Sequence, residues 1–174
     1  VLTGPNAGGK TVALKTVGLL SLLHHCGLPI PCLAGTTLGW TSRFVATVGD
    51  DQDLLADRST FSGRLLKLRE AWDSASHDSL VLLDELGSGT DPEEGAALSV
   101  ALLERLVEQR TLGLITTHLT KVAAAALDLA GAACGAMEFS PDGGRPTFRL
   151  VIGPPGGSEA IALARRLGLS PVWV

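Results

Sequence analysis

Residues 1–16, VLTGPNAGGKTVALKT, decide the fold, because Gly4, four further residues and then Gly9-Lys10-Thr11 match G-x-x-x-x-G-K-[ST]. A loop with this spacing wraps backbone N–H groups around the phosphates of a nucleotide. Lys10 would reach the β- and γ-phosphates, and the Thr11 hydroxyl would bind Mg²⁺. We therefore predict a nucleotide-binding loop formed by Gly4, Pro5, Asn6, Ala7, Gly8, Gly9, Lys10, Thr11 and Val12.

The residues on both sides of this loop fit a strand–loop–helix unit. The apolar pair Val1-Leu2 precedes the loop, and apolar residues at helical spacing follow it. They predict a largely buried helix that ends near Cys26-Gly27 and whose N-terminal dipole favours anions. A glycine turn that matches the pattern by chance is the alternative interpretation, and the surrounding context argues against it.

Composition indicates a single, well-buried domain. The chain has 174 residues, of which 45% are hydrophobic and 18% charged. A net charge of -4 without a run of Lys or Arg argues against a major nucleic-acid surface in this segment. The odd set Cys26, Cys32 and Cys134 lacks metal-ligand spacing and predicts small buried thiols in a reducing compartment. No apolar run reaches bilayer length, so we expect a cytoplasmic protein with no membrane partner.

Strand-like and helix-like segments alternate along the rest of the chain. We expect strands at 42–49, 79–85, 112–118, 136–139 and 147–152, with those at 79–85 and 112–118 buried. One helix is expected to begin at Ser59 or Thr60. Another is expected after an N-cap at Asp91, with Pro92 and Glu94 in its first turn. Two further helices are expected at 121–127 and 158–167. This alternation predicts an α/β fold with a mainly parallel sheet flanked by helices, of the P-loop NTPase kind.

A second chemical motif lies at 80–91, LVLLDELGSGTD. Asp84 at the end of the apolar run can meet the Mg²⁺ held by Thr11, directly or through water. Glu85 beside it is placed to orient or deprotonate a water that attacks the γ-phosphate. The alternative is a solvated pair of acids at a strand end, which the upstream loop disfavours.

Two further polar residues are weaker candidates. His118 ends the apolar run LITTH and would act as a γ-phosphate sensor or would cap a local turn. Gln52 would contact the metal or the water, and a surface glutamine explains it equally well.

Four segments together resemble a known family: GPNAGGKT, STFS, LVLLDELGSGTDP and TTH occur in the order and approximate spacing of the ATPase domain of MutS proteins, a branch of the ABC-type ATPases. Three details resemble the second bacterial MutS type, the paralogue associated with suppressing recombination. These are VALKTVGL after Thr11, GTDPEEGAAL after the acidic pair, and the tail GPPGGSEAIALARRLGL.

The resemblance implies catalysis by a head-to-tail homodimer that ATP promotes, with ATP and Mg²⁺ as cofactors. Each nucleotide would lie between the loop of one subunit and a signature segment of the other, formed by Ser59, Thr60 and Phe61. The loop residues Gly87, Ser88, Gly89, Thr90 and Asp91 would face the same interface, as would Asn6. A serine that only caps its own helix is the alternative for Ser59.

It also implies that residues 1–174 are an ATPase domain truncated at its N-terminus, without the core, clamp and nuclease-like domains. DNA, or alternatively a ribosome, would be bound by regions outside this chain, and any endonuclease activity would lie there too. The expected function is Mg²⁺-dependent ATP hydrolysis, with Lys10, Glu85 and His118 as catalytic groups, that drives dimerisation of a DNA-processing protein in suppression of homologous recombination. The alternatives are a nucleotide-gated clamp with little hydrolysis and the ATPase head of a mismatch-repair MutS.

Overall fold

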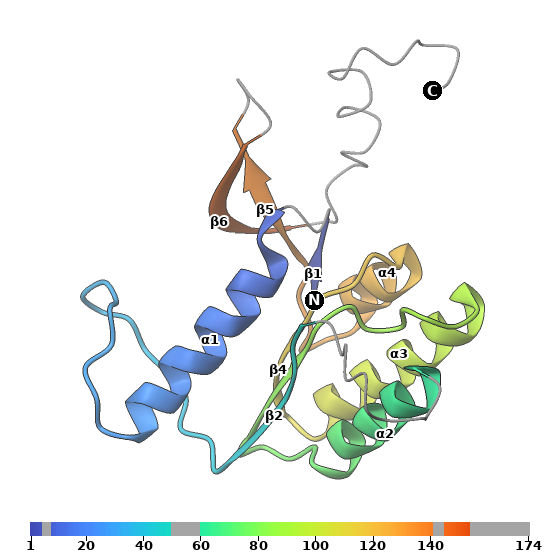
Figure 1. Ribbon diagram of the computed structural model, residues 1–174, viewed down its shortest axis with the longest axis horizontal. Coiled ribbons are helices and arrows are strands. Elements are labelled where there is room, and N and C mark those ends of the chain that lie inside the picture. The colour runs from blue at the N-terminus through green and yellow to red at the C-terminus, as the bar shows by residue number, and fades with distance from the viewer. Residues whose placement is uncertain (5–7, 50–59, 141–144, 154–174) are drawn as a thin grey trace.

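The computed structural model describes residues 1–4, 8–49, 60–140 and 145–153 (Figure 1). Helices and strands alternate there in the expected order, and the expected helix at 158–167 lies outside the described residues. The elements are β1 (Leu2–Thr3), α1 (Lys10–His25), β2 (Arg43–Thr47), α2 (Thr60–Asp73), β3 (Ser79–Leu83), α3 (Pro92–Glu108), β4 (Leu112–Ile115), α4 (Thr120–Asp128), β5 (Gly135–Phe139) and β6 (Pro146–Ile152).

The strands form two three-stranded sheets, ordered β2-β3-β4 and β1-β5-β6. Strand β3 pairs in parallel with β2 and β4, β1 pairs in parallel with β5, and β5 and β6 form an antiparallel pair. A parallel bridge between Leu2 and Thr116 joins the two sheets, and the Thr117 N–H donates to the Leu2 carbonyl at 3.1 Å. The prediction of a mainly parallel α/β fold is confirmed.

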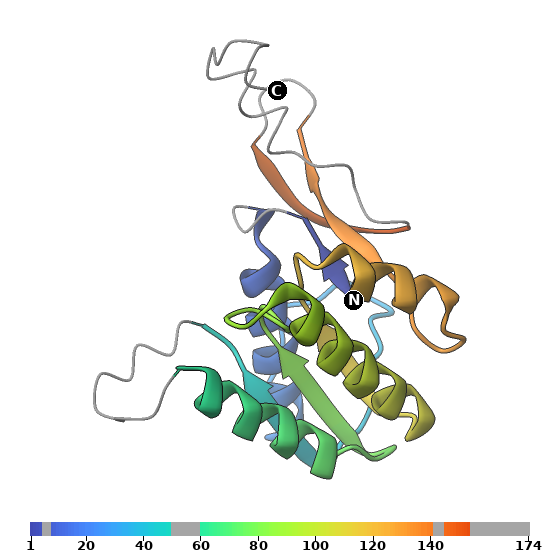
Figure 2. The ribbon, with the colours of Figure 1, turned by 90° about the vertical axis from the view of Figure 1, so that its right-hand side faces the viewer.

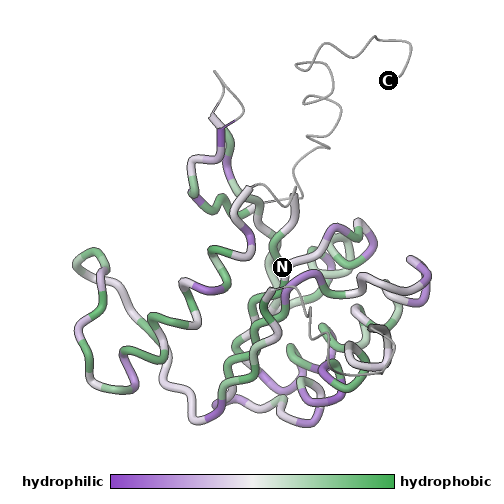
Figure 3. Tube along the Cα trace, in the orientation of Figure 1, coloured by the Kyte–Doolittle hydropathy of each residue, from purple (hydrophilic) through white to green (hydrophobic). Residues whose placement is uncertain are grey.

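Helices cover both faces of the β2-β3-β4 sheet: α1 lies on one side, and α2 and α3 lie on the other (Figures 1 and 2). All five residues of β3 are buried. Because successive side chains of a strand point to opposite faces, Leu80 and Leu82 pack with Leu14, whereas Val81 and Leu83 join the larger core beneath α3. The hydropathy colours follow this arrangement, with the apolar residues gathered along the strands (Figure 3).

Two expectations about burial are wrong. Helix α1 buries one narrow stripe, formed by Lys10, Leu14, Gly18 and Ser21, because it packs on the sheet from one side. Several of its other apolar residues stay exposed: Val12 at 53%, Leu19 at 58% and Leu22 at 47%. Strand β4 is buried only toward its carboxyl end, since the short β1 reaches it at the single Leu2–Thr116 bridge and leaves Leu112 at an open edge.

The cysteine prediction is correct for one thiol only. Cys134 is buried and donates its S–H to the Ala123 carbonyl at 3.1 Å, and burial raises the pKa of this thiol. Cys26 and Cys32 are exposed, because the first follows the end of α1 and the second lies in the connection to β2. Within the described ranges, no helix combines the length and the apolar character needed to cross a bilayer.

Candidate nucleotide site

The glycines of the predicted loop adopt backbone conformations that side chains disfavour. Gly4 has φ 112° and Gly9 has φ 92°, and Gly9 is also the N-cap of α1. Gly9 has no side chain to cap the helix, so the first N–H groups of α1 receive no hydrogen bond from their N-cap residue. A sixteen-residue helix that begins here adds its dipole to the preference for an anion.

Lys10 is the buried cation of this loop. Only 2% of its surface is exposed, and its ammonium donates a hydrogen bond to the Gly4 carbonyl. Burial lowers the pKa of the Lys10 ammonium, while the nearby carboxylates of Glu85 and Asp84 oppose that shift. The ammonium is therefore held against the backbone of the loop, within electrostatic reach of the acidic pair.

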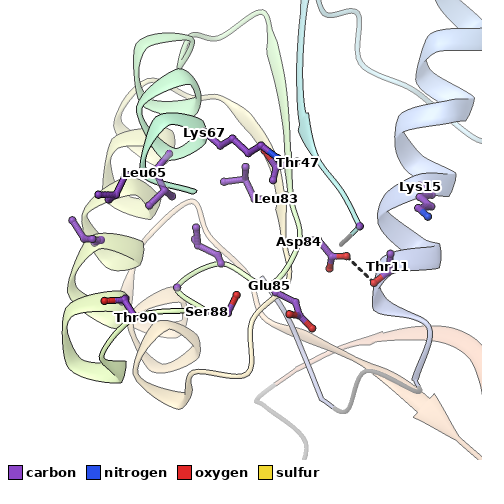
Figure 4. Close-up of a pocket in the computed structure, with 16 residues that line it drawn as sticks. Thr11, Lys15, Thr47, Leu65, Lys67, Leu83, Asp84, Glu85, Ser88 and Thr90 are labelled. Atoms are coloured by element: carbon purple, nitrogen blue, oxygen red, sulfur yellow. Dashed lines mark hydrogen bonds between the residues drawn. The ribbon is translucent and has the colours of Figure 1, made fainter. Parts of the chain in front are cut away.

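A hydrogen-bonded network links the loop to the acidic strand end, and Figure 4 shows its bond between Thr11 and Asp84. The Thr11 hydroxyl donates to Asp84 Oδ2 at 2.7 Å, and the Thr116 hydroxyl donates to Asp84 Oδ1 at 2.6 Å. The Asp84 N–H in turn donates to the Thr47 carbonyl at 2.8 Å, which continues the β2–β3 pairing by one residue. Both carboxylate oxygens of Asp84 are thus occupied by hydroxyl groups from two different elements.

Glu85 follows in a strained conformation. Its φ of 52° lies in the left-handed region, which a residue with a long side chain rarely adopts. Its N–H donates to the Thr116 hydroxyl at 2.8 Å, and the next N–H, of Leu86, donates to the Thr116 carbonyl at 2.9 Å. The turn at the end of β3 places the Glu85 carboxylate beside Asp84 at the same end of the cleft (Figure 4).

A cleft of about 410 Å³ opens in front of these residues. Thr11, Lys15, Asp84 and Glu85 line one part of it, and leucines of α2, β3 and α3 line another. The loop after β3 contributes Gly87, Ser88 and Thr90. The arrangement places a glycine loop with a buried lysine near a threonine–aspartate pair and a second carboxylate, which suits the binding and hydrolysis of a nucleoside triphosphate.

Residues 1–159 match the protein family described as MutS domain V. The chain belongs to the MutS family. It is 47% identical over 169 residues to Endonuclease MutS2 of Thermotoga petrophila, and 49% identical over the same length to that of Thermus thermophilus. The aligned part covers 97% of this chain in both comparisons, but only 22% and 23% of the relatives. The chain thus spans less than a quarter of the length of these relatives.

The structure brings together the central residues of the predicted MutS site. Lys10, Thr11, Asp84 and Glu85 converge, and Gly87, Ser88 and Thr90 line the cleft next to them. Gly89 is exposed. Asp91 is the N-cap of α3, where its carboxylate accepts hydrogen bonds from the N–H groups of Glu93 at 2.9 Å and Glu94 at 3.3 Å.

Other candidates are placed elsewhere or lie outside the described residues. His118 follows β4 with an exposed side chain and does not line the cleft, so its role as a γ-phosphate sensor stays a prediction. Val12 is exposed on α1. Thr60 and Phe61 begin α2, where only the backbone is described. Outside the described residues lie Pro5, Asn6, Ala7, Gln52 and Ser59.

Sequence reasoning predicted the antiparallel strands β5 and β6 but missed that they pack against the predicted loop. A Cβ atom on Gly8 would lie 3.2 Å from the Phe139 ring, and one on Gly9 would lie 2.9 Å from the Phe148 ring. The strands themselves were predictable, but nothing in their residues indicated that they pack on the loop. Thr116 was missed as well, although its place at the end of an apolar strand was a usable signal.

The oxygen donors at this site fit Mg²⁺. Thr11 and Asp84 present a hydroxyl and a carboxylate 2.7 Å apart, and Mg²⁺ is usually held by one or two carboxylates together with substrate phosphates. Across the described part of the chain, no cluster of three or more His, Cys, Asp or Glu residues forms a metal cage. The residues therefore suit a metal that arrives with the nucleotide.

Proposed function

We propose that this chain binds ATP together with Mg²⁺ and hydrolyses it, as the ATPase domain of a DNA-processing protein of the second bacterial MutS type. The observation that supports the proposal best is the hydrogen bond between Thr11 and Asp84 at 2.7 Å, made next to the buried ammonium of Lys10. This bond joins two motifs that are 73 residues apart in the sequence, one suited to bind an anion and the other suited to bind a cation.

Each described residue then has a distinct role. The N–H groups at the start of α1 and the Lys10 ammonium bind the β- and γ-phosphates. Thr11 and Asp84 would hold the Mg²⁺, which would supply neutralisation of charge on the transferred phosphoryl group. Glu85 orients the attacking water and accepts its proton, because its carboxylate lies one residue beyond the metal-binding acid.

The function of the whole protein is proposed from its relatives. Proteins named Endonuclease MutS2 share 46 to 49% identity with this chain in the comparisons with Thermotoga petrophila, Thermus thermophilus and Clostridium novyi. We infer that the intact protein acts on DNA through regions outside this chain, in suppression of homologous recombination. ATP would promote a head-to-tail homodimer in which the loop at 87–91 faces the partner's nucleotide.

The experiment that tests hydrolysis compares Glu85→Gln with the parent chain. The substitution keeps the size and hydrogen-bonding capacity of Glu85 but removes the base, so ATP binding should persist while turnover falls by about 10²-fold or more. Glu104→Gln is the matched control, since Glu104 is an exposed residue of α3 remote from the cleft lining. Steady-state phosphate release and fluorescent-nucleotide binding are the two measurements.

Asp84→Asn should reduce hydrolysis more than nucleotide binding, because it weakens the metal ligand and leaves the phosphate loop intact. If the parent chain binds ATP but releases no phosphate with or without the rest of the protein, the nucleotide-gated clamp replaces the ATPase as the proposed function. If Glu85→Gln hydrolyses ATP as fast as the parent, a different group is the base.

A further inference from the structure

Thr116 occupies the point where the strand after α3 meets both acidic residues. It is completely buried, at 0% exposure, and it forms the bridge to Leu2 between the two sheets. Its backbone N–H donates to the Leu83 carbonyl at 2.9 Å, and its carbonyl accepts from the Leu86 N–H at 2.9 Å. The backbone of Thr116 is therefore hydrogen-bonded to the residue before the Asp84-Glu85 pair and to the residue after it.

The side chain of Thr116 then contacts both members of that pair. A hydroxyl has one proton to donate and lone pairs to accept with. The proton goes to Asp84 Oδ1 at 2.6 Å, and the oxygen accepts from the Glu85 N–H at 2.8 Å. One oxygen atom thus touches the carboxylate of Asp84 and the backbone of Glu85.

These two contacts fix different properties. The bond to Oδ1 prevents rotation of the Asp84 carboxylate and leaves Oδ2 directed at Thr11, 2.7 Å away. The bond from the Glu85 N–H stabilises a residue whose φ of 52° is unfavourable for its type. Without the hydroxyl, the carboxylate could turn and the Glu85 backbone would lose one of the bonds that hold it in the left-handed region.

We propose that Thr116 is a positioning residue for the reaction, whose single hydroxyl orients the metal-binding face of Asp84 and holds the Glu85 backbone in register with it. The proposal rests on the proposed ATPase function for its catalytic consequence. Its structural part, the coupling of both acids through one oxygen, applies whether or not the chain hydrolyses ATP.

Thr117 provides a matched control in the adjacent position. It is equally buried, at 1% exposure, and its hydroxyl also makes two hydrogen bonds. It donates to the Leu86 carbonyl at 3.0 Å and accepts from the Leu119 N–H at 3.1 Å, so both of its partners are backbone groups. Thr117→Val therefore removes as many hydrogen bonds as Thr116→Val, without touching either acidic residue.

The test compares Thr116→Val, Thr116→Ser and Thr117→Val in three measurements. The first is the Mg²⁺ concentration that half-saturates binding of a fluorescent ATP analogue, together with the affinity of that analogue in EDTA. The second is kcat and KM for ATP hydrolysis. The third is the hydrogen-exchange rate of the Glu85 amide without any ligand, measured by NMR.

We expect Thr116→Val to raise the half-saturating Mg²⁺ concentration (the Mg²⁺ midpoint) by about 10- to 100-fold. We expect kcat to fall by a similar factor, since this is the usual cost of removing a group that orients a metal ligand. The EDTA affinity and KM should change little, because the phosphate loop is untouched. The Glu85 amide should exchange at least about tenfold faster. Thr116→Ser should restore all three values, and Thr117→Val should leave the Mg²⁺ midpoint and Glu85 exchange at the parent values.

A Thr116→Val protein with the parent's Mg²⁺ midpoint and Glu85 exchange rate would overturn the proposal, as would a Thr117→Val protein with the same changes as Thr116→Val. If Thr116→Val does not fold, Thr116→Ala removes the same hydroxyl with less bulk and is judged by the same values. If the parent does not hydrolyse ATP, the proposed function fails, and the exchange rate still decides the role of Thr116.

Discussion

Lys10 combines deep burial with a positive charge. Burying an ammonium is costly, and here the cost is offset by the Gly4 carbonyl and by the fields of Glu85 and Asp84, which oppose the lowering of the Lys10 pKa. A buried cation beside a glycine loop can bind a phosphate with little competition from solvent. The side chain is therefore expected to contribute to binding rather than to stability.

Lys10→Ala is predicted to weaken ATP binding by at least about tenfold, since charge-assisted hydrogen bonds contribute roughly 1.5–3 kcal/mol each. The unfolding temperature without nucleotide should rise or stay unchanged, because the substitution removes a charge whose burial opposes folding. Nucleotide titration and calorimetry measure the two effects. Lys121→Ala, at an exposed ion pair with Glu93, is the control that should leave binding unchanged. ATP affinity within about twofold of the parent for Lys10→Ala would contradict the phosphate-loop assignment.

At the scale of elements, the first turn of α3 sets the position of the loop after the acidic pair. A Cβ atom on Gly95 would lie only 2.3 Å from the Gly87 carbonyl oxygen and 3.2 Å from the Thr90 methyl group. Gly87 itself has φ 83°, which a side chain would strain. The helix and the loop can pack this closely because both positions are glycine.

Gly95→Ala should therefore lower the free energy of unfolding by about 1–3 kcal/mol, the usual cost of overpacking, and should displace the loop that lines the cleft. Gly63→Ala in α2 is the matched control, because the added methyl group would meet no described atom within 4 Å. That change should be neutral or stabilising by up to about 1 kcal/mol, through helix propensity. Urea denaturation measures both. Equal effects of the two substitutions would mean that the α3–loop contact does not constrain the fold.

Local patterns predicted most of the elements but the exposure of only some of them. Asp91-Pro92 marked the start of α3 correctly, because capping depends on neighbouring residues alone. The continuous apolar run of β3 correctly indicated a strand covered on both faces. The similar run in β4 did not, because the exposure of Leu112 depends on how far the neighbouring strand β1 extends.

At the scale of the whole molecule, the open question is whether two copies complete one site. We predict that a mixture of Lys10→Ala and Ser59→Ala proteins regains part of the ATPase activity that each has lost. A mixed dimer would contain one composite site with an intact phosphate loop and an intact Ser59. Ser59 lies outside the described residues, so this prediction rests on the family resemblance.

The measurement is phosphate release by the mixture, under conditions where sedimentation shows mixed dimers. Adding Glu85→Gln to the subunit with the intact phosphate loop is the control, because that substitution removes the base from the only complete site and should abolish the recovery. Activity no greater than the sum of the separate variants would show that Ser59 only caps its own helix.

The sequence by itself determined the features whose physics is local. The spacing of Gly4, Gly9, Lys10 and Thr11 predicts a phosphate loop, since close approach of the backbone depends on those glycines. The order of strands and helices follows from periodicity and capping. The pairing of this loop with Asp84 was also predictable, because the carboxyl ends of parallel strands meet at one edge.

Only the tertiary structure decided which of two adjacent threonines serves the acidic pair. Thr116 and Thr117 have the same chemistry, and the sequence does not distinguish them. In the extended chain after β4 their side chains point in opposite directions, so the pairing with β3 directs one hydroxyl to Asp84 and the other to the backbone of Leu86. The packing of β5 and β6 against Gly8 and Gly9 was also decided by the tertiary structure. It depends on long-range sheet pairing, which no local pattern specifies.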